Sequence, residues 1–291
     1  MKQAELIFDA KATLGEGPCW LSESNKLIWV DINGYSVNLF DPATGTNQSH
    51  DIGQYVGAAV VREKGGLLLA LYHGFYFYDL ETKQLTAVGD PESDIETNRF
   101  NDGKCDPEGR FWAGTMVLDG EPGDANLYRM NKDLNVERLI SGVTISNGMA
   151  WNIEKETMYY IDTPTKKIRS YDFLMKTGEI TNHQTAITIS EGMGSPDGMT
   201  IDEEGMLWVA FFGGWKVIRF DPETGESLTE ISVPASQVTS CAFGGEQLNE
   251  LYITTARIGL SDEELEKQPH AGGVFRVKLD IKGAPSYQFK G

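Results

Sequence analysis

The sequence predicts an all-β protein, a six-bladed β-propeller that forms one domain over residues 1–291. Two patterns predict this fold. A short apolar strand motif with an aromatic or large aliphatic residue at its centre recurs six times, and a second strand motif follows each copy. Repetition at a period of about 40 to 50 residues is typical of propellers, in which each blade is a sheet of about four strands.

The first motif is the middle strand of each expected blade. In the fifth copy it reads Leu207-Trp208-Val209-Ala210. Its central residue is repeated at steps of 40, 43, 48, 48 and 44 residues, which is a regular period, at Trp29, Leu69, Trp112, Tyr160, Trp208 and Tyr252. A single meander cannot bury both of its faces, so each copy must pack on its neighbours.

The second motif is the third strand of each blade. Its copies begin at Asn38, Phe75, Asn126, Ile168, Val217 and Val274. Turns of the Asp-Pro-x-Thr-Gly kind follow two of them, at residues 41–45 and 221–225. Proline at the second position and glycine at the fifth favour a tight reversal into a fourth strand.

Three other segments complete the expected fold. The N-terminal run Ala4–Phe8 is expected to complete the last blade and close the ring. The insert at residues 261–270 predicts a short helix, because Ser261 can cap it and acidic residues fill its first turn. The tryptophans at repeat positions, Trp20, Trp112, Trp151 and Trp208, are expected in the blade core. Trp215, by contrast, is expected in a loop, where its side chain could line a pocket.

Composition limits the possible partners. The formal net charge is −18, from 25 Lys plus Arg against 43 Asp plus Glu. This argues against nucleic acid or an anionic membrane as a partner. The N-terminal apolar run is too short for a signal peptide and no segment could span a bilayer, so we expect a cytoplasmic protein. The three cysteines share no CxxC spacing and are expected to be small buried residues.

Polar residues recur where each expected inner strand begins. The six leading positions are Glu16, Val56, Asp102, Asn147, Asp197 and Thr239. Four of these six carry a carboxylate or carboxamide. A glycine follows five of these six. Because the inner strands of a propeller line one channel, these side chains would meet at its mouth. Asp-Gly and Asn-Gly are also common hairpin turns, but turns do not explain a shared repeat position.

Converging oxygen ligands suggest a cation site. Carboxylates that meet in a buried place repel one another unless a cation neutralises them. Hard oxygen ligands suit Ca²⁺, Mg²⁺ or Mn²⁺. The four histidines form no HxH, HxxxH or HExxH pair, so an imidazole-rich zinc site is not expected.

Several motifs resemble one known family, that of senescence marker protein-30 (regucalcin), gluconolactonase and luciferin-regenerating enzyme, including the bacterial sugar lactone lactonases. The resemblance covers nearly the whole chain. It is carried by the stretches 14–20, 99–107, 109–116, 146–151 and 196–200. It implies a six-bladed propeller that hydrolyses sugar lactones with one divalent cation in its channel, in agreement with the repeat count.

Carried over residue by residue, the resemblance implies roles for individual side chains. Glu16, Asn147 and Asp197 would bind the cation, with Ca²⁺ the first expectation and Zn²⁺, Mn²⁺ or Mg²⁺ the alternatives. Asp197 would also transfer the proton. The residues that would bind the substrate are Arg99, Asn101 and an acid near Asp119, for which Glu121 is the alternative. Alignment by glycine nominates Asp102 instead of Asn101, and we expect Asp102 to lie just behind the ligands.

The predicted activity is therefore hydrolysis of a small sugar lactone, with the cation polarising the carbonyl. A serine triad is not expected, because no Gly-x-Ser-x-Gly occurs and Ser195 has no histidine beside it in sequence. Two alternatives remain open. One is a non-catalytic propeller that binds calcium or a protein partner. The other is a propeller esterase for aryl esters or organophosphates.

Overall fold

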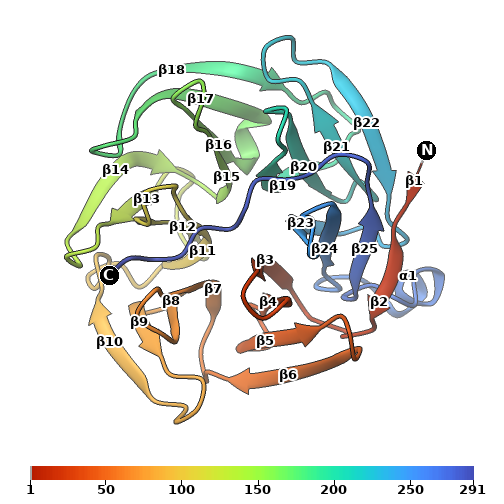
Figure 1. The fold of residues 1–291 in the computed structure, drawn as a ribbon, viewed down its shortest axis with the longest axis horizontal. Coiled ribbons are helices and arrows are strands. Elements are labelled where there is room, and N and C mark those ends of the chain that lie inside the picture. The colour runs from red at the N-terminus through yellow and green to blue at the C-terminus, as the bar shows by residue number, and fades with distance from the viewer. Residues whose placement is uncertain (1) are drawn as a thin grey trace.

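Six sheets surround a common axis in the computed structural model, which describes residues 2–291 (Figure 1). From the axis outward the strands of each sheet follow in sequence order and antiparallel to one another, apart from the N-terminal strands β1 and β2 that join the outer edges of two sheets. The predicted six-bladed β-propeller is confirmed.

Each blade has an inner, a second, a third and an outer strand. Blades one to three contain β3 (Gly15–Leu21), β4 (Lys26–Asp31), β5 (Ser36–Asp41), β6 (Thr46–Asp51); β7 (Val56–Val61), β8 (Leu67–Leu71), β9 (Gly74–Tyr78), β10 (Leu85–Gly89); and β11 (Asn98–Cys105), β12 (Phe111–Val117), β13 (Ala125–Met130), β14 (Val136–Val143). Blades four to six contain β15 (Ser146–Asn152), β16 (Thr157–Asp162), β17 (Lys167–Leu174), β18 (Glu179–Thr188); β19 (Ser195–Ile201), β20 (Leu207–Phe212), β21 (Lys216–Phe220), β22 (Ser227–Ser232); and β23 (Val238–Gly244), β24 (Glu250–Thr255), β25 (Val274–Lys278).

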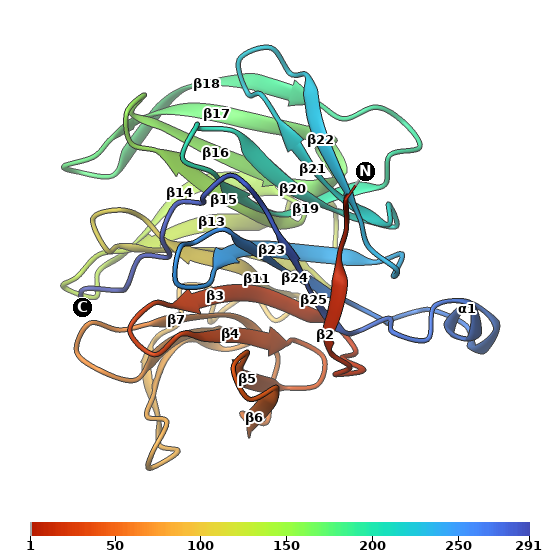
Figure 2. The same cartoon turned by 45° about the vertical axis from the view of Figure 1, so that its right-hand side comes forward.

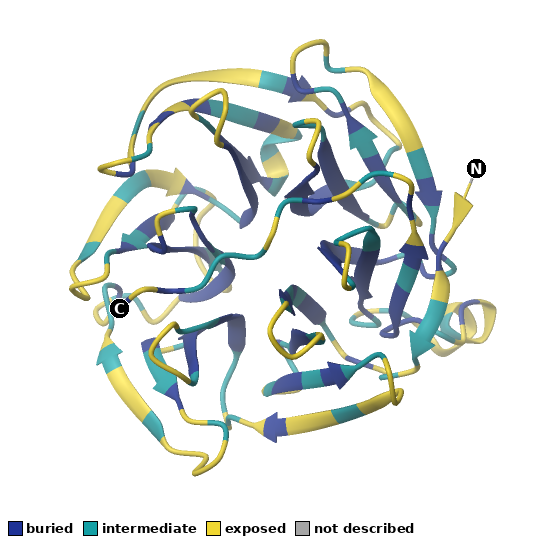
Figure 3. Cartoon of the chain, viewed as in Figure 1, coloured by how far each residue is buried: buried dark blue, intermediate teal, exposed yellow. Residues whose placement is uncertain are grey.

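The two repeated motifs are the second and third strands of the blades, as predicted. Burial decreases from the axis outward. Inner and second strands are almost entirely buried, whereas outer strands such as β10 and β18 are largely exposed (Figure 3). The repeated tryptophans pack inside and between blades; Trp112 and Trp208 are fully buried. Apolar packing between neighbouring sheets therefore fixes the ring, and the inner strands come together at the axis.

The N-terminus closes the ring. The strand β2 (Glu5–Phe8) pairs antiparallel with β25, so the last blade combines the two ends of the chain. This confirms the expected role of Ala4–Phe8. A feature not predicted is β1 (Lys2–Gln3), which adds a parallel edge to β22 of blade five. The N-terminal segment therefore ties blade five to blade six.

The predicted short helix is present as α1 (Asp262–Lys267), which stands off the side of the ring (Figure 2). Ser261 is its N-cap. The Ser261 hydroxyl accepts the backbone N–H of Glu264, and the Glu264 carboxylate accepts the backbone N–H of Ser261 at 2.8 Å. This reciprocal capping box explains why the helix begins there.

The C-terminal segment after β25 crosses the axis on one face of the ring (Figure 1). Its backbone forms hydrogen bonds to several blades: Ala284 donates to the Ile201 carbonyl at 3.0 Å, and Phe289 donates to the Val61 carbonyl at 2.8 Å. Lys290 does the same to the Gly109 carbonyl. These contacts lie at the ends of the inner strands. The segment therefore covers one end of the channel and leaves the other as the mouth.

Candidate active site

Every inner strand carries a β-bulge near the mouth. In blade five, Asp197 and Gly198 together oppose the single residue Ala210 of β20. The corresponding two-residue bulges of β11 and β15 contain Asn101 with Asp102, and Asn147 with Gly148. The strands β3, β7 and β23 also shift register at this level. Bulges bend a strand and re-aim its side chains, so the same device in each blade turns polar residues toward one place.

The glycines of these pairs are explained by close approach of neighbouring inner strands. A Cβ at Gly198 would lie 2.0 Å from Ser240 Oγ of blade six. A Cβ at Gly148 would lie 2.6 Å from the Cβ of Met199 in blade five. Both glycines lie within strands. The hairpin-turn interpretation of these Asp-Gly and Asn-Gly pairs is therefore wrong.

The three predicted cation ligands are buried side chains on β3, β15 and β19. Glu16, Asn147 and Asp197 are only 4 to 6% exposed. The Asn147 amide is oriented because its Nδ2 donates to the Thr163 hydroxyl at 3.0 Å, and that hydroxyl donates to the Pro196 carbonyl. This leaves Asn147 Oδ1 free.

The electrostatics of this cluster disfavour negative charge. Burial, and then the Asp102 carboxylate, raise the pKa of Glu16 to about 8. Burial together with Glu16 and Asp102 raises the pKa of Asp197 well above the ordinary value for aspartate. Within residues 2–291, neither Glu16 nor Asp197 forms an ion pair within 4.0 Å. The cluster thus contains carboxylates that repel one another without a neutralising cationic partner in contact.

Arg99 and Asn101 form a second polar group on β11. Arg99 Nη1 donates to Asn101 Oδ1 at 2.8 Å and to the Phe100 carbonyl at 2.9 Å. The Asn101 Nδ2 in turn donates to the Ser146 carbonyl of blade four. Burial lowers the pKa of Arg99 to about 10, and Glu16, the Tyr55 ring and Asp197 act against this shift. Arg99 is thus a fixed, positively charged side chain near the ligand cluster.

Asp102 shares the bulge with Asn101, which explains why both positions could be nominated from sequence. Burial raises the pKa of Asp102, and the Lys104 ammonium together with the Gly103 backbone N–H lowers it. Asp102 and Lys104 line a cavity of about 50 Å³ in the channel, whose lining does not include Glu16, Asn147 or Asp197. Asp102 therefore lies next to the ligand cluster, and its expected place just behind the ligands stays a prediction.

Comparison with known proteins identifies the family of this chain. Residues 14–257 match the family described as SMP-30/Gluconolactonase/LRE-like region. The YvrE protein of Bacillus subtilis (strain 168), named as a candidate sugar lactone lactonase, is 43% identical over 288 residues, with 99% of each chain covered. Regucalcin of Danio rerio is 40% identical over 292 residues, again with 99% of each covered. The chain belongs to this family.

A solved structure from the same family has nearly the same fold. It is described as a calcium-binding protein, regucalcin, from Agrobacterium tumefaciens strain C58. The two structures superpose with a TM-score of 0.95 at 27% identity, over 100% of this chain and 98% of that one. Family membership thus brings together proteins named for lactone hydrolysis and proteins named for calcium binding.

The side chains at the mouth fit a divalent cation. Asn147 Oδ1 and Asp197 Oδ1 are buried acceptors with no hydrogen-bond partner in residues 2–291, and such atoms are rare in folded proteins. With Glu16 they supply two carboxylates and one amide oxygen, which are ligands that Ca²⁺ accepts. No group of three or more His, Cys, Asp and Glu side chains in the described chain could hold a metal. Asn147, an amide and not one of these residue types, supplies the third oxygen of the set.

Asp119 lies apart from the buried cluster. It is an exposed residue of the loop between β12 and β13, and Glu121 in the same loop is exposed too. The backbone N–H of Asp119 lies 3.3 Å from the Thr97 carbonyl, which places the loop beside the start of β11. The loop thus contacts Thr97, two residues before Arg99, but its exposed acids do not join the buried ligand cluster. Which acid contacts the substrate stays a prediction.

Trp215 and the cysteines can now be placed. Trp215 is 44% exposed in the loop between β20 and β21, at the mouth end of blade five. Its role as a pocket wall stays a prediction.

Cys105 and Cys241 are buried, as expected, and Cys19 is half-buried; all three are free thiols. In residues 2–291 no helix is both long and apolar enough to cross a membrane.

The sequence did not predict the buried polar network around Glu92. This residue lies in the loop before β11 and is buried although the rest of residues 90–97 is not. A lone glutamate in a loop gives no signal of burial. The bulges were also missed, although the x-Gly pairs mark them in retrospect.

Proposed function

We propose that this chain is a metal-dependent hydrolase that opens sugar lactones. One observation carries the proposal: buried acceptor oxygens of Asn147 and Asp197 have no partner in residues 2–291 and lie in a cluster with Glu16. The family assignment supports the same reaction, because a 43% identical relative is named as a candidate sugar lactone lactonase.

Glu16, Asn147 and Asp197 would hold the cation, and Ca²⁺ is the first choice for an all-oxygen ligand set. When bound, a divalent cation polarises the lactone carbonyl and stabilises the oxyanion that forms on its oxygen. The protein contributes ligands whose positions are fixed by the bulges and by the Asn147 to Thr163 hydrogen bond. Such preorganised ligands need no rearrangement during the reaction.

Asp197 is the proposed proton-transfer residue. Water forms a bond to the carbonyl carbon while Asp197 takes one of its protons, and the ring C–O bond then breaks as Asp197 returns the proton to the leaving oxygen. Burial and two neighbouring carboxylates raise the pKa of Asp197, which makes it a stronger base than an exposed aspartate. The charge of a bound cation acts in the opposite direction.

Arg99 and Asn101 are the proposed substrate-binding pair. Of the Arg99 guanidinium, only Nη1 has protein partners in residues 2–291. Its other N–H groups remain for a substrate. Guanidinium groups bind hydroxyl and carbonyl oxygens in a fixed geometry, which suits a lactone that carries several hydroxyl groups.

The test follows proton release from glucono-1,5-lactone in weak buffer, with spontaneous opening subtracted. The protein is first treated with a chelator, and Ca²⁺, Zn²⁺, Mn²⁺ or Mg²⁺ is then restored. We expect acceleration only with metal, and a loss of about a thousandfold in Asp197→Asn, the range for removal of a general acid–base group. The matched control is Asp202→Asn, another buried aspartate at the opposite end of β19.

Other outcomes would redirect the proposal. Metal binding without hydrolysis of any lactone would contradict it and favour a calcium-binding propeller. Faster hydrolysis of an aryl ester or organophosphate than of any lactone would contradict the sugar-lactone assignment. A cytoplasmic location stays a prediction.

A further inference from the structure

Glu92 is a buried carboxylate at the mouth end of blade three that the proposed reaction does not use. It is 7% exposed and forms no ion pair within residues 2–291. A buried charge without a cationic partner is costly unless hydrogen bonds compensate it. The contacts of Glu92 are accordingly numerous.

Four side chains donate to this carboxylate. Its Oε1 accepts hydrogen bonds from Thr115 Oγ1 at 3.0 Å, Asn126 Nδ2 at 2.6 Å and Tyr128 Oη at 2.9 Å. Its Oε2 accepts one from Asn98 Nδ2 at 3.0 Å. Burial, and after it the interaction with Glu92, raises the pKa of Tyr128. Four donors require an acceptor with no N–H or O–H of its own, and a carboxylate is the side chain that meets this requirement.

These donors come from three strands at the level of the active-site bulge. Asn98 begins β11, and Thr115 of β12 pairs with Phe100, the last paired residue before the bulge. Asn126 and Tyr128 lie on β13. Glu92 therefore fixes the three strands relative to one another immediately before Asn101 and Asp102 leave the ladder.

The network also reaches the loop that carries the predicted substrate acids. Asn98 Nδ2 donates to the Asp124 carbonyl at 3.0 Å as well as to Glu92. At the other end of the loop, Leu118 donates its backbone N–H to the Thr97 carbonyl at 2.8 Å. Both ends of residues 118–124 are thus attached to the segment that Glu92 anchors.

We propose that Glu92 is a positioning residue for substrate binding: it sets the place of Arg99 and Asn101 and of the 118–124 loop without touching substrate. This inference rests on the proposed lactone hydrolysis. It assigns cation binding and sugar binding to different parts of the mouth. Glu16, Asn147 and Asp197 would hold the cation, while blade three, ordered by Glu92, would hold the sugar.

Glu92→Gln is the informative variant. The glutamine keeps one oxygen for Thr115, Asn126 and Tyr128, but its N–H₂ then faces the amide of Asn98. Asn98 can accept that bond only by rotating its amide, which breaks its bond to the Asp124 carbonyl. We expect KM for glucono-1,5-lactone to rise about fivefold, the equivalent of about one hydrogen bond, with kcat and the Ca²⁺ dissociation constant nearly unchanged.

Amide hydrogen exchange gives a readout that does not depend on activity. In Glu92→Gln we expect faster exchange at residues 97–101 and 118–124 than in the wild type. Asp202→Asn is the control: it also alters a buried carboxylate with four donors, at the far end of blade five, and should change neither KM nor exchange at those residues. Tyr128→Phe, which removes one donor and keeps the ring, should change both in the same direction but less.

Three results would decide the matter. If Glu92→Gln leaves both KM and exchange at the wild-type values, or changes them no more than Asp202→Asn does, the inference is wrong. If Glu92→Gln loses Ca²⁺ binding, Glu92 acts on the cation site and the proposed division of roles is wrong. If the wild type opens no lactone, the proposed function fails, and exchange alone then tests whether Glu92 orders blade three.

Discussion

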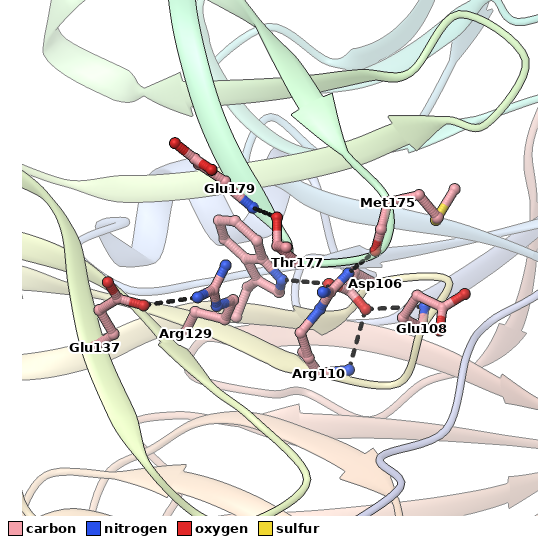
Figure 4. Close-up of polar contacts among 9 residues, drawn as sticks. Asp106, Glu108, Arg110, Arg129, Glu137, Met175, Thr177 and Glu179 are labelled. Carbon is pink, nitrogen blue, oxygen red and sulfur yellow. Dashed lines mark hydrogen bonds and ion pairs between the residues drawn. The ribbon is translucent and has the colours of Figure 1, made fainter.

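Two inner strands, β11 and β19, have an acidic residue at each end, and the two ends surround these residues differently. At the far end, Asp106 follows β11 and Asp202 follows β19. Each accepts two backbone N–H groups of the next turn, the indole N–H of a second-strand tryptophan and the Nε–H of an arginine. Figure 4 shows the Asp106 group, in which Arg110 also donates to the Met175 carbonyl of blade four. Both carboxylate oxygens of Asp106 and of Asp202 are thus hydrogen-bonded.

At the mouth, β11 carries Asp102 and β19 carries Asp197, beside Glu16 of β3, and these carboxylates are under opposite conditions. Their carboxylates raise one another's pKa or that of a neighbour, and Asp197 Oδ1 has no partner in residues 2–291. Both ends are buried, so burial alone does not distinguish a structural acid from a functional one. The distinction lies in whether hydrogen bonds and counter-charges inside the protein satisfy the carboxylate.

The largest expected effect is on stability: the same Asp→Asn substitution should change the free energy of unfolding in opposite directions at the two ends. Asp202→Asn should lower the free energy of unfolding by about 3 kcal/mol, because it breaks a buried pair with Arg219. Asp197→Asn should raise the stability of the cation-free protein by about 1 kcal/mol, since it removes one of the repelling carboxylates. Urea unfolding of chelated protein measures both. Equal destabilisation by the two substitutions would contradict the claim that carboxylates are satisfied at the far end and unsatisfied at the mouth.

The pH dependence of stability gives a smaller effect. The pKa of Glu16 is raised from 4.5 to about 8. The folded chain therefore binds a proton that the unfolded chain has lost between these values, and stability falls as the pH rises through this window. Thermal unfolding of chelated protein should occur about 3 °C lower at about pH 8 than at about pH 6.

Two variations sharpen this pH test. Glu16→Gln should reduce the difference in unfolding temperature, because it removes the titrating group and its repulsion of Asp197. Added Ca²⁺ should stabilise the wild type more at the higher pH, where the carboxylates are ionised. A wild-type slope that persists unchanged in Glu16→Gln would show that other groups cause it.

Periodicity revealed the fold because each blade repeats the same packing problem. The regular spacing of Trp29, Trp112 and Trp208 reflects a buried second strand in each sheet, and local residue types are enough to recognise it. The shared position of Asp197 and Asn147 likewise required only the repeat. These features depend on residues that are close in sequence or equivalent between blades.

Features that depend on distant contacts could not be predicted in this way. Gly198 is required by Ser240 of the next blade, not by a turn. Glu92 is buried because four donors from other strands surround it, and the C-terminal segment lies across the channel through single backbone bonds to several blades. One signal was available: the six-residue step from Asp106 to Trp112 recurs from Asp202 to Trp208, and it marks the satisfied end of the strands.

The most direct test of this account is calorimetric titration of chelated protein with Ca²⁺, comparing the wild type, Asp197→Asn and Asp202→Asn at about pH 8, where ionisation of the mouth carboxylates is most favoured. The account predicts one site per chain in the wild type, loss of that site in Asp197→Asn, and an unchanged site in Asp202→Asn. Wild-type binding by Asp197→Asn, or loss of binding in folded Asp202→Asn alone, would contradict the claim that the unsatisfied carboxylates at the mouth form the cation site.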